Sequence, residues 1–166
     1  MNNSTDISHL EQLIDEWQDS LYALAFFRIG DEGAAQDVVQ EAFIRYYREQ
    51  QRTTIVNAKA WLYRTTLNLA IDYLRRRPPI RAVPLAAALG KADDEQHALH
   101  EEFLRLEQLL APLPADQAAV VRLHFADGLS MSEIAEILCL PRDTVKSRYR
   151  YAMEKLRKIM NRKPNQ

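Results

Sequence analysis

The sequence predicts an all-helical (all-α) protein made of two small domains. Hydrophobic residues account for 47% of its 166 residues and glycine for only four of them, which is typical of a folded chain rather than a disordered one. Apolar residues recur at the spacing of amphipathic helices on both sides of a proline- and alanine-rich stretch at 78–92. We therefore expect helical domains at 1–77 and 93–166, joined by a flexible linker, with a helix-turn-helix in the second domain.

Three helices are expected in the first domain. The first follows Ser8 and is broken by the Gly-Asp-Glu-Gly stretch at 30–33. The second continues to about Gln50, and the third covers about Asn57 to Arg77 after a loop at 51–56. One face of the third helix aligns the polar residues Arg64, Asn68, Asp72 and Arg75.

The third helix interleaves basic and aromatic residues. Such a mixture suits contact with a nucleic-acid backbone and stacking on unpaired bases. The alternative is that Trp61 and Tyr63 are ordinary core and surface aromatics. For Trp61 the alternative is at least as well supported by the spacing.

The second domain begins with a helix whose apolar stripe runs from Leu99 to Leu110 and is stopped by two prolines. Another helix covers about 115–126. Ser130, followed three residues later by Glu133, is a capping box, so a further helix should begin at Met131.

A tight turn follows that capped helix. Pro141 disfavours helical geometry at the residue before it, and a new helical pattern starts near Arg142. Two short helices across a tight turn, the second of them basic, describe a helix-turn-helix.

Charge is strongly segregated along the chain, although the net charge is −1. Residues 1–51 hold ten acidic residues against three arginines, whereas residues 142–163 hold nine Lys/Arg against two acids. Residues 57–77 are also basic, and residues 91–111 are acidic. A basic recognition helix matches the phosphate backbone and reads base edges with its N-terminal part. The alternative is a solvated basic helix, which would need neither the turn nor the partner helix before it.

Little in the sequence indicates enzymatic or metal chemistry. There is one cysteine, which argues against a disulfide framework. No glycine-rich phosphate loop, nucleophile elbow or zinc-ligand spacing occurs. His97 and His100 lack a matching Cys/His set, so a solvated helix face is the better interpretation. We expect no catalytic residue, metal, cofactor or small-molecule substrate.

The chain also lacks a basic segment followed by an apolar run at its N-terminus. No uninterrupted apolar stretch approaches the length of a membrane span. We expect no membrane insertion and a cytoplasmic location.

Four sequence blocks resemble a known family. Residues 36–45 (QDVVQEAFIR) and 60–64 (AWLYR), continuing through Asn68, Asp72 and Arg75, resemble conserved region 2 of bacterial sigma factors. Leu129-Ser130 with residues 133–135 and residues 144–148 (TVKSR) resembles region 4. Two such regions joined by a short linker resemble the extracytoplasmic-function (ECF) group of the sigma-70 family.

The resemblance implies a sigma factor that binds core RNA polymerase and promoter DNA and that has an anti-sigma factor as a further partner. It implies a face for core polymerase formed by Asp37, Gln40, Glu41, Phe43 and Arg45, with Phe43 partly in the core. It implies contacts with a single-stranded −10 element through Tyr63, Arg64, Asn68, Arg75 and Arg76, with Asn68 lining a base pocket. It implies reading of a duplex −35 element by Arg142, Asp143, Thr144, Lys146, Ser147, Arg148, Arg150 and Tyr151.

Two positions depart from the family pattern. Asp143 stands where glycine is common, and it suits the helix dipole or accepts a hydrogen bond from a cytosine amino group. Tyr151 stands where a basic residue is common. Both departures concern the −35 sequence that is read, not the function.

Two other classes of function explain fewer of these features. A free-standing helix-turn-helix regulator leaves the acidic face of the second helix unexplained, and an oligomeric scaffold leaves the charge segregation unexplained. The linker composition also suggests that nothing fixes the two domains at one spacing, and that acidic surfaces of the free protein approach basic ones and mask them.

Overall fold

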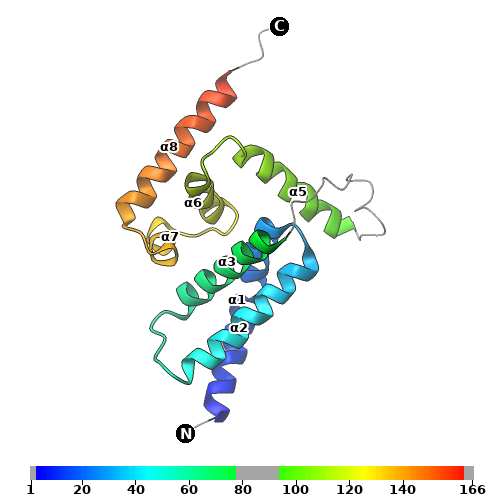
Figure 1. Cartoon of the computed structure of the whole chain (residues 1–166), viewed down its shortest axis with the longest axis vertical. Coiled ribbons are helices and arrows are strands. Elements are labelled where there is room, and N and C mark those ends of the chain that lie inside the picture. The colour runs from blue at the N-terminus through cyan, green and yellow to red at the C-terminus, as the bar shows by residue number, and fades with distance from the viewer. Residues whose placement is uncertain (1–2, 78–93, 163–166) are drawn as a thin grey trace.

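The computed structural model describes residues 3–77 and 94–162; the predicted linker at 78–92 lies outside them. Within these ranges every regular element is an α-helix, which confirms the predicted fold class. The helices are α1 (Asn3–Ile29), α2 (Glu32–Gln50), α3 (Ala58–Arg76), α5 (Asp94–Leu110), α6 (Ala115–Phe125), α7 (Met131–Leu138) and α8 (Arg142–Asn161). Helices α1 to α3 lie side by side as one bundle, and the second group, α5 to α8, contacts this bundle mainly through α7, which packs on α3, while α8 extends away from it (Figure 1).

The start of α1 differs from the prediction. The helix begins at Asn3 instead of after Ser8. Residues 3–8 carry a single large apolar side chain, Ile7, which is exposed. Apolar periodicity therefore gave no signal there, whereas Asp6 in the first turn is favourable next to the positive end of the helix dipole.

Side-chain caps set the starts of the following helices. The Asp31 carboxylate accepts a hydrogen bond from the Ala34 N–H at 2.7 Å, and the Asn57 side chain accepts one from the Ala60 N–H at 3.0 Å. Each cap satisfies a backbone donor that has no partner inside the helix. The third predicted helix is therefore correctly placed, with Asn57 as its cap.

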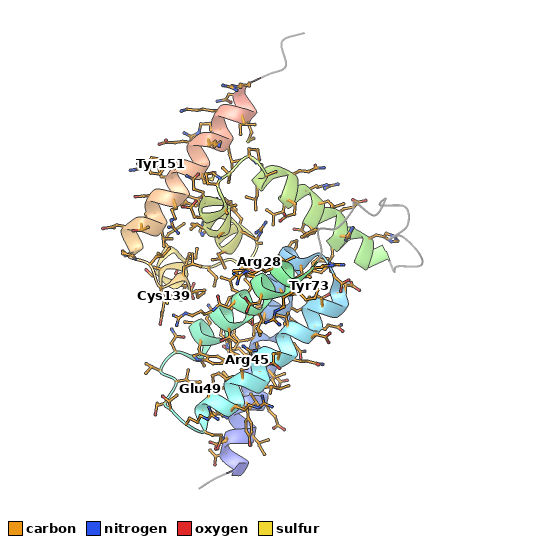
Figure 2. The ribbon with its side chains drawn as sticks, in the orientation of Figure 1. Arg28, Arg45, Glu49, Tyr73, Cys139 and Tyr151 are labelled. Carbon is orange, nitrogen blue, oxygen red and sulfur yellow. The ribbon has the colours of Figure 1, made fainter. Side chains whose placement is uncertain are left out.

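The helix-turn-helix is confirmed, with both halves of the capping box present. The Glu133 N–H donates to Ser130 Oγ at 3.2 Å, and Glu133 Oε2 accepts from the Ser130 N–H at 2.8 Å. Cys139 ends α7 in the left-handed conformation, with φ at 54°. It lies on the turn between α7 and α8 (Figure 2).

The two domains share one hydrophobic core. Helix α7 packs against α3, and its buried Ile134 and Ile137 belong to the same cluster as Leu62 and Leu67. The two domains are therefore in contact in this structure, although the linker composition predicts that they are not rigidly fixed to each other. The sequence reading assigned α7 one apolar side, but its eight residues bury Ile134, Ala135 and Ile137 against α3 as well as against α6 and α8.

Helix α5 makes a second attachment between the domains. Its Phe103 ring lies 5.9 Å from the Phe26 ring of α1, centroid to centroid. At its other end, Leu110 is buried with Leu156 of α8 in a smaller cluster. Helix α5 therefore belongs to the second domain while one of its side chains rests on the first.

Gly30 makes room for Phe103. A Cβ atom at Gly30 would lie 2.8 Å from the Phe103 ring, and the residue has φ +72°. We expect Gly30→Ala to destabilise the protein by more than the roughly 1–2 kcal/mol that a left-handed alanine costs. Gly128→Ala is the matched control, since Gly128 has φ +64° and open space around its Cβ position. Equal urea unfolding midpoints for the two variants would show that Phe103 adapts without cost.

Candidate nucleic-acid interface

The outward face of α8 is polar and basic. Arg142, Asp143, Lys146 and Arg150 are exposed, and Thr144 and Ser147 are half-buried. Val145 and Ala152 on the opposite face are fully buried. The Arg150 guanidinium lies 5.1 Å from the centroid of the exposed Tyr151 ring (Figure 2). An arginine held against an aromatic ring is a preorganised donor for a phosphate or a base edge.

Arg148 is placed differently from the other α8 residues in the predicted −35 set. Its Nε lies 3.3 Å from the Asp116 carboxylate of α6, and its side chain is 30% exposed. The residue stands one turn after the buried Val145, which directs it toward α6. In this structure Arg148 therefore ties α8 to α6, while its predicted contact with the −35 element stays a prediction.

The C-terminal half of α3 carries three of the predicted −10 residues in the open. Asn68, Arg75 and Arg76 are all exposed. Arg75 lies 3.6 Å from Asp72 in an exposed ion pair between their side chains, which contributes little to stability. These three side chains are available to a nucleic acid.

Tyr63 is a core residue, which corrects its assignment to the −10 surface. Its side chain is 2% exposed and packs edge-on against Trp17 of α1, with 6.3 Å between ring centroids. Burial raises the pKa of the Tyr63 hydroxyl, and the carboxylates of Asp127 and Glu133 add to that rise. Two carboxylates of the second domain therefore lie near Tyr63. The sequence of the first domain alone does not predict these neighbours.

The N-terminal part of α3 is engaged with α7. Arg64 donates from Nε to the Ile137 carbonyl at 3.1 Å and from Nη2 to the Glu136 carbonyl at 2.6 Å. Asn57 Nδ2 donates to the Glu136 carboxylate at 2.9 Å, and Lys59 Nζ donates to the Glu133 carboxylate at 2.6 Å. The predicted −10 residue Arg64 is therefore occupied in this arrangement.

A hollow of about 320 Å³ lies beside these contacts. It is lined by the loop before α3, including Thr54 and Ile55, by Trp61 and Arg64 of α3, and by Glu136 of α7. Residues 51–56 are the predicted loop, and the family resemblance implies that this loop takes part in −10 recognition together with α3. The nearby 96% exposed Val56 is consistent with a loop that keeps its side chains free for a ligand.

The predicted polymerase face on α2 is mostly exposed. Asp37 and Gln40 are exposed, and Glu41 accepts a hydrogen bond from Arg45 Nε at 2.7 Å. Phe43 is 7% exposed, so its contribution is mainly to the core, as the sequence reading allowed.

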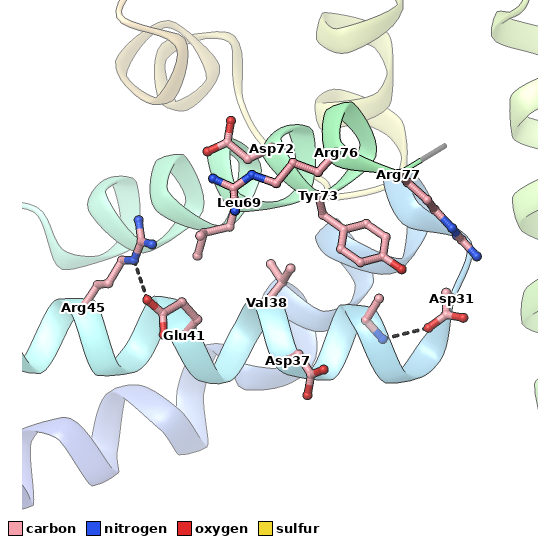
Figure 3. A pocket seen from close by; sticks show the side chains of 11 residues that line it. Asp31, Asp37, Val38, Glu41, Arg45, Leu69, Asp72, Tyr73, Arg76 and Arg77 are labelled. Carbon is pink, nitrogen blue, oxygen red and sulfur yellow. Dashed lines mark hydrogen bonds and ion pairs between the residues drawn. The ribbon is translucent and has the colours of Figure 1, made fainter. Parts of the chain in front are cut away.

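A groove of about 490 Å³ between α2 and α3 brings two predicted sites together (Figure 3). Asp37, Glu41 and Arg45 line it from α2, and Asp72 and Arg76 line it from α3. Val38 and Leu69 are among its apolar residues, and Tyr73 points between the two helices (Figure 3). The groove continues from the face predicted for polymerase to the face predicted for DNA.

A second groove, of about 550 Å³, lies between α1 and α2 and is mostly apolar. Its apolar lining residues are Leu10, Ile14, Val39, Phe43, Ile44 and Tyr47. Ile44, which interrupts the polar side of α2, is 44% exposed there. An isoleucine on an otherwise polar helix face was the signal in the sequence for this groove.

Metal and membrane features are lacking in the part of the chain that the structure describes. Residues 3–77 and 94–162 contain no group of three or more side chains able to hold a metal ion. None of the helices in those ranges has the length and apolarity needed to cross a membrane.

Comparison with known proteins agrees with this architecture. The sigma-70 region 2 family matches residues 13–78, and the sigma-70, region 4 family matches residues 109–158. The fold and its surfaces thus define a sigma-70-type protein with these two regions. The ECF RNA polymerase sigma factor SigW of Bacillus subtilis (strain 168) is 32% identical over 161 residues, which cover 88% of this chain and 86% of SigW. The chain belongs to the ECF RNA polymerase sigma factors.

Solved structures share the fold. CnrH, in complex with the cytosolic domain of CnrY, matches with a TM-score of 0.66 and 26% identity over 92% of this chain and 87% of CnrH. The sigma factor RpoE, in complex with the anti-sigma factor NepR from Bartonella quintana, matches with a TM-score of 0.63 and 24% identity. That match covers 92% of this chain and 96% of the RpoE chain.

Proposed function

We propose that this chain binds core RNA polymerase and directs it to promoters by reading a −35 element as duplex and a −10 element as a single strand. The observation that supports this most is the presence of regions 2 and 4 in order in one chain, each with an exposed polar face. The family consists of transcription initiation factors, and catalysis belongs to the polymerase.

The duplex element is assigned to α8. Arg142, Asp143, Lys146 and Arg150 point to solvent from the first half of a helix whose other side is packed. A helix placed in this way enters the major groove with its N-terminal residues at base edges. Asp143 is suited to accept a hydrogen bond from a cytosine amino group.

The single-stranded element is assigned to α3 and to the loop before it. Asn68, Arg75 and Arg76 are exposed on its surface, and Arg64 and Trp61 line the adjacent hollow. Guanidinium groups follow the backbone, and an aromatic ring stacks on unpaired bases. An anti-sigma factor is assigned as a further partner, on the strength of the complex formed by the similar RpoE.

Run-off transcription tests the proposal directly. Core RNA polymerase would be mixed with this protein as the only added factor and with a pool of linear templates whose −35 and −10 segments are randomised. We expect transcripts from a subset of templates that share both elements. Transcript levels equal to those of core polymerase alone would overturn the proposal, and a free-standing regulator would give that result while still binding duplex.

The face of α2 gives a second test. We expect the double reversal Asp37→Lys with Arg45→Glu to weaken core polymerase binding by at least tenfold, because both exposed charges line the groove described above. Helicity by circular dichroism should not change. The double reversal Glu102→Lys with Arg105→Glu on α5, where both residues are also exposed, is the control, because both double variants leave the net charge unchanged. Unchanged core affinity in the double variant would remove this face from the interface.

A further inference from the structure

Three side chains at the N-terminal end of α3 donate hydrogen bonds to oxygen atoms of the short helix α7. Asn57, Lys59 and Arg64 donate to the Glu136 carboxylate, the Glu133 carboxylate and the carbonyls of Glu136 and Ile137. The four nitrogen-to-oxygen distances lie between 2.6 and 3.1 Å. Helix α7 is thus held at both of its ends by the same segment of α3.

The α7 side of this contact is anionic. The Lys59 ammonium and the Ser130 N–H hold the pKa of Glu133 below its ordinary value, so that this carboxylate is ionised at neutral pH. The last carbonyls of a helix carry partial negative charge, and Arg64 binds two of them. Two carboxylates and two polarised carbonyls give α3 the kind of acceptors that a phosphate backbone offers.

The covered surface is the one suited to an unpaired strand. Glu136 lines the hollow beside Trp61 and Arg64, so a strand in that hollow and α7 would need the same space and the same donors. The exposed face of α8 takes no part in these contacts. The closed protein therefore offers its duplex-reading helix while this part of its strand-binding surface is covered.

We infer that α7 is an internal competitor for single-stranded nucleic acid, whose acidic residues occupy the donors of α3 until the second domain moves away. The inference rests on the proposed function of α3. It assigns the first helix of the helix-turn-helix a role beyond positioning α8. Release of α7 in the polymerase complex then couples −10 binding to domain separation.

The test uses the full chain without polymerase. The variant is Glu133→Gln with Glu136→Gln, which keeps the capping box because glutamine also serves at that position. The control is Glu101→Gln with Glu102→Gln on α5, which removes the same charge from exposed positions. The probe is a fluorescein-labelled DNA single strand of mixed sequence, about 12 nucleotides long, within the usual range of single-strand sites.

We expect the α7 variant to bind the strand at least tenfold more tightly than the wild type at low salt, and the α5 control to bind within twofold of the wild type. Small-angle scattering should give a larger radius of gyration for the α7 variant alone. Equal affinities for the two variants would overturn the inference. If the double variant is unfolded, the single variant Glu136→Gln, which leaves the capping box untouched, is compared with the α5 control in the same binding measurement. Failure of run-off transcription by the wild type would instead count against the proposed function.

Discussion

Replacing Arg28 with methionine should destabilise the closed protein by about 3–5 kcal/mol, the usual cost of removing one partner from a buried ion pair. The guanidinium comes from the end of α1 and lies 3.6 Å from the Asp127 carboxylate between α6 and α7; the side chains are 5% and 0% exposed. Without Arg28 the buried carboxylate would lose its partner across the domain boundary. Urea unfolding and small-angle scattering measure the loss of stability and the separation of the domains.

Two further variants make this prediction specific to the buried pair. Arg28→Met combined with Asp127→Leu should recover most of the lost stability, since apolar replacement of a whole buried pair is often neutral or favourable. Arg105→Met removes the partner of Glu101 in a pair whose side chains are 80% and 69% exposed, and should change stability by less than about 1 kcal/mol. If Arg28→Met and Arg105→Met have the same unfolding midpoint, the Arg28 pair contributes nothing to closure.

Stability should increase as the pH falls from 7 toward 5. Burial raises the pKa of the Asp127 carboxyl from 3.8 to about 6, although Arg28 and Arg122 oppose that rise. The folded protein therefore binds a proton in a range where the unfolded chain does not. The stabilisation is complete below the unfolded pKa and is lost as the pH rises through about 6. The whole shift corresponds to about 3 kcal/mol at 1.36 kcal/mol per unit, and roughly half of it is gained between pH 7 and pH 5.

The charged groups around Asp127 fix the pH window of this effect. Arg28 belongs to α1 and Arg122 to α6, where Arg122 is paired with Glu107 of α5. The Arg28 pKa is lowered to about 10, chiefly by burial, so Arg28 stays charged across the range. Glu133 acts in the opposite direction at lower pH, because its pKa is depressed below 4.5 and its contribution is lost on acidification.

Urea unfolding midpoints at pH 5 and pH 7.5 provide the measurement. The wild type should be more stable at the lower pH, and Asp127→Asn should lose most of that difference. A wild-type stability that falls steadily from pH 7.5 to pH 5 would contradict the assignment to Asp127.

Local features of the structure were predictable from the sequence because their partners are neighbours in the chain. The Ser130–Glu133 capping box spans three residues, and both the turn at Pro141 and the start of α8 followed from one proline. The exposed positions of Asp37, Asn68 and Lys146 followed from helical spacing. Each of these depends on a few consecutive residues.

The domain interface could not be predicted in the same way. The carbonyls that bind Arg64 lie 72 and 73 residues along the chain. Tyr63 was assigned to the −10 surface by the family resemblance, whereas its ring packs against Trp17 of α1. Contacts between helices on opposite sides of a linker do not produce a periodic pattern of apolar residues, so the sequence pattern does not predict them.

The two hydrophobic attachments between the domains, which the Arg28–Asp127 pair supplements, have a kinetic consequence. Helix α7 rests on α3, and Phe103 of α5 rests on the Gly30 turn, so each holds the other in place. When one of these contacts breaks, the other keeps the two surfaces close together, at the millimolar effective concentration that a short tether provides. The surfaces therefore rebind each other before a partner that associates slowly can bind either of them. A partner that covers only one attachment must compete with this rebinding. A partner that binds at both attachment sites holds the domains in the arrangement that it binds, open or closed, for as long as it stays bound.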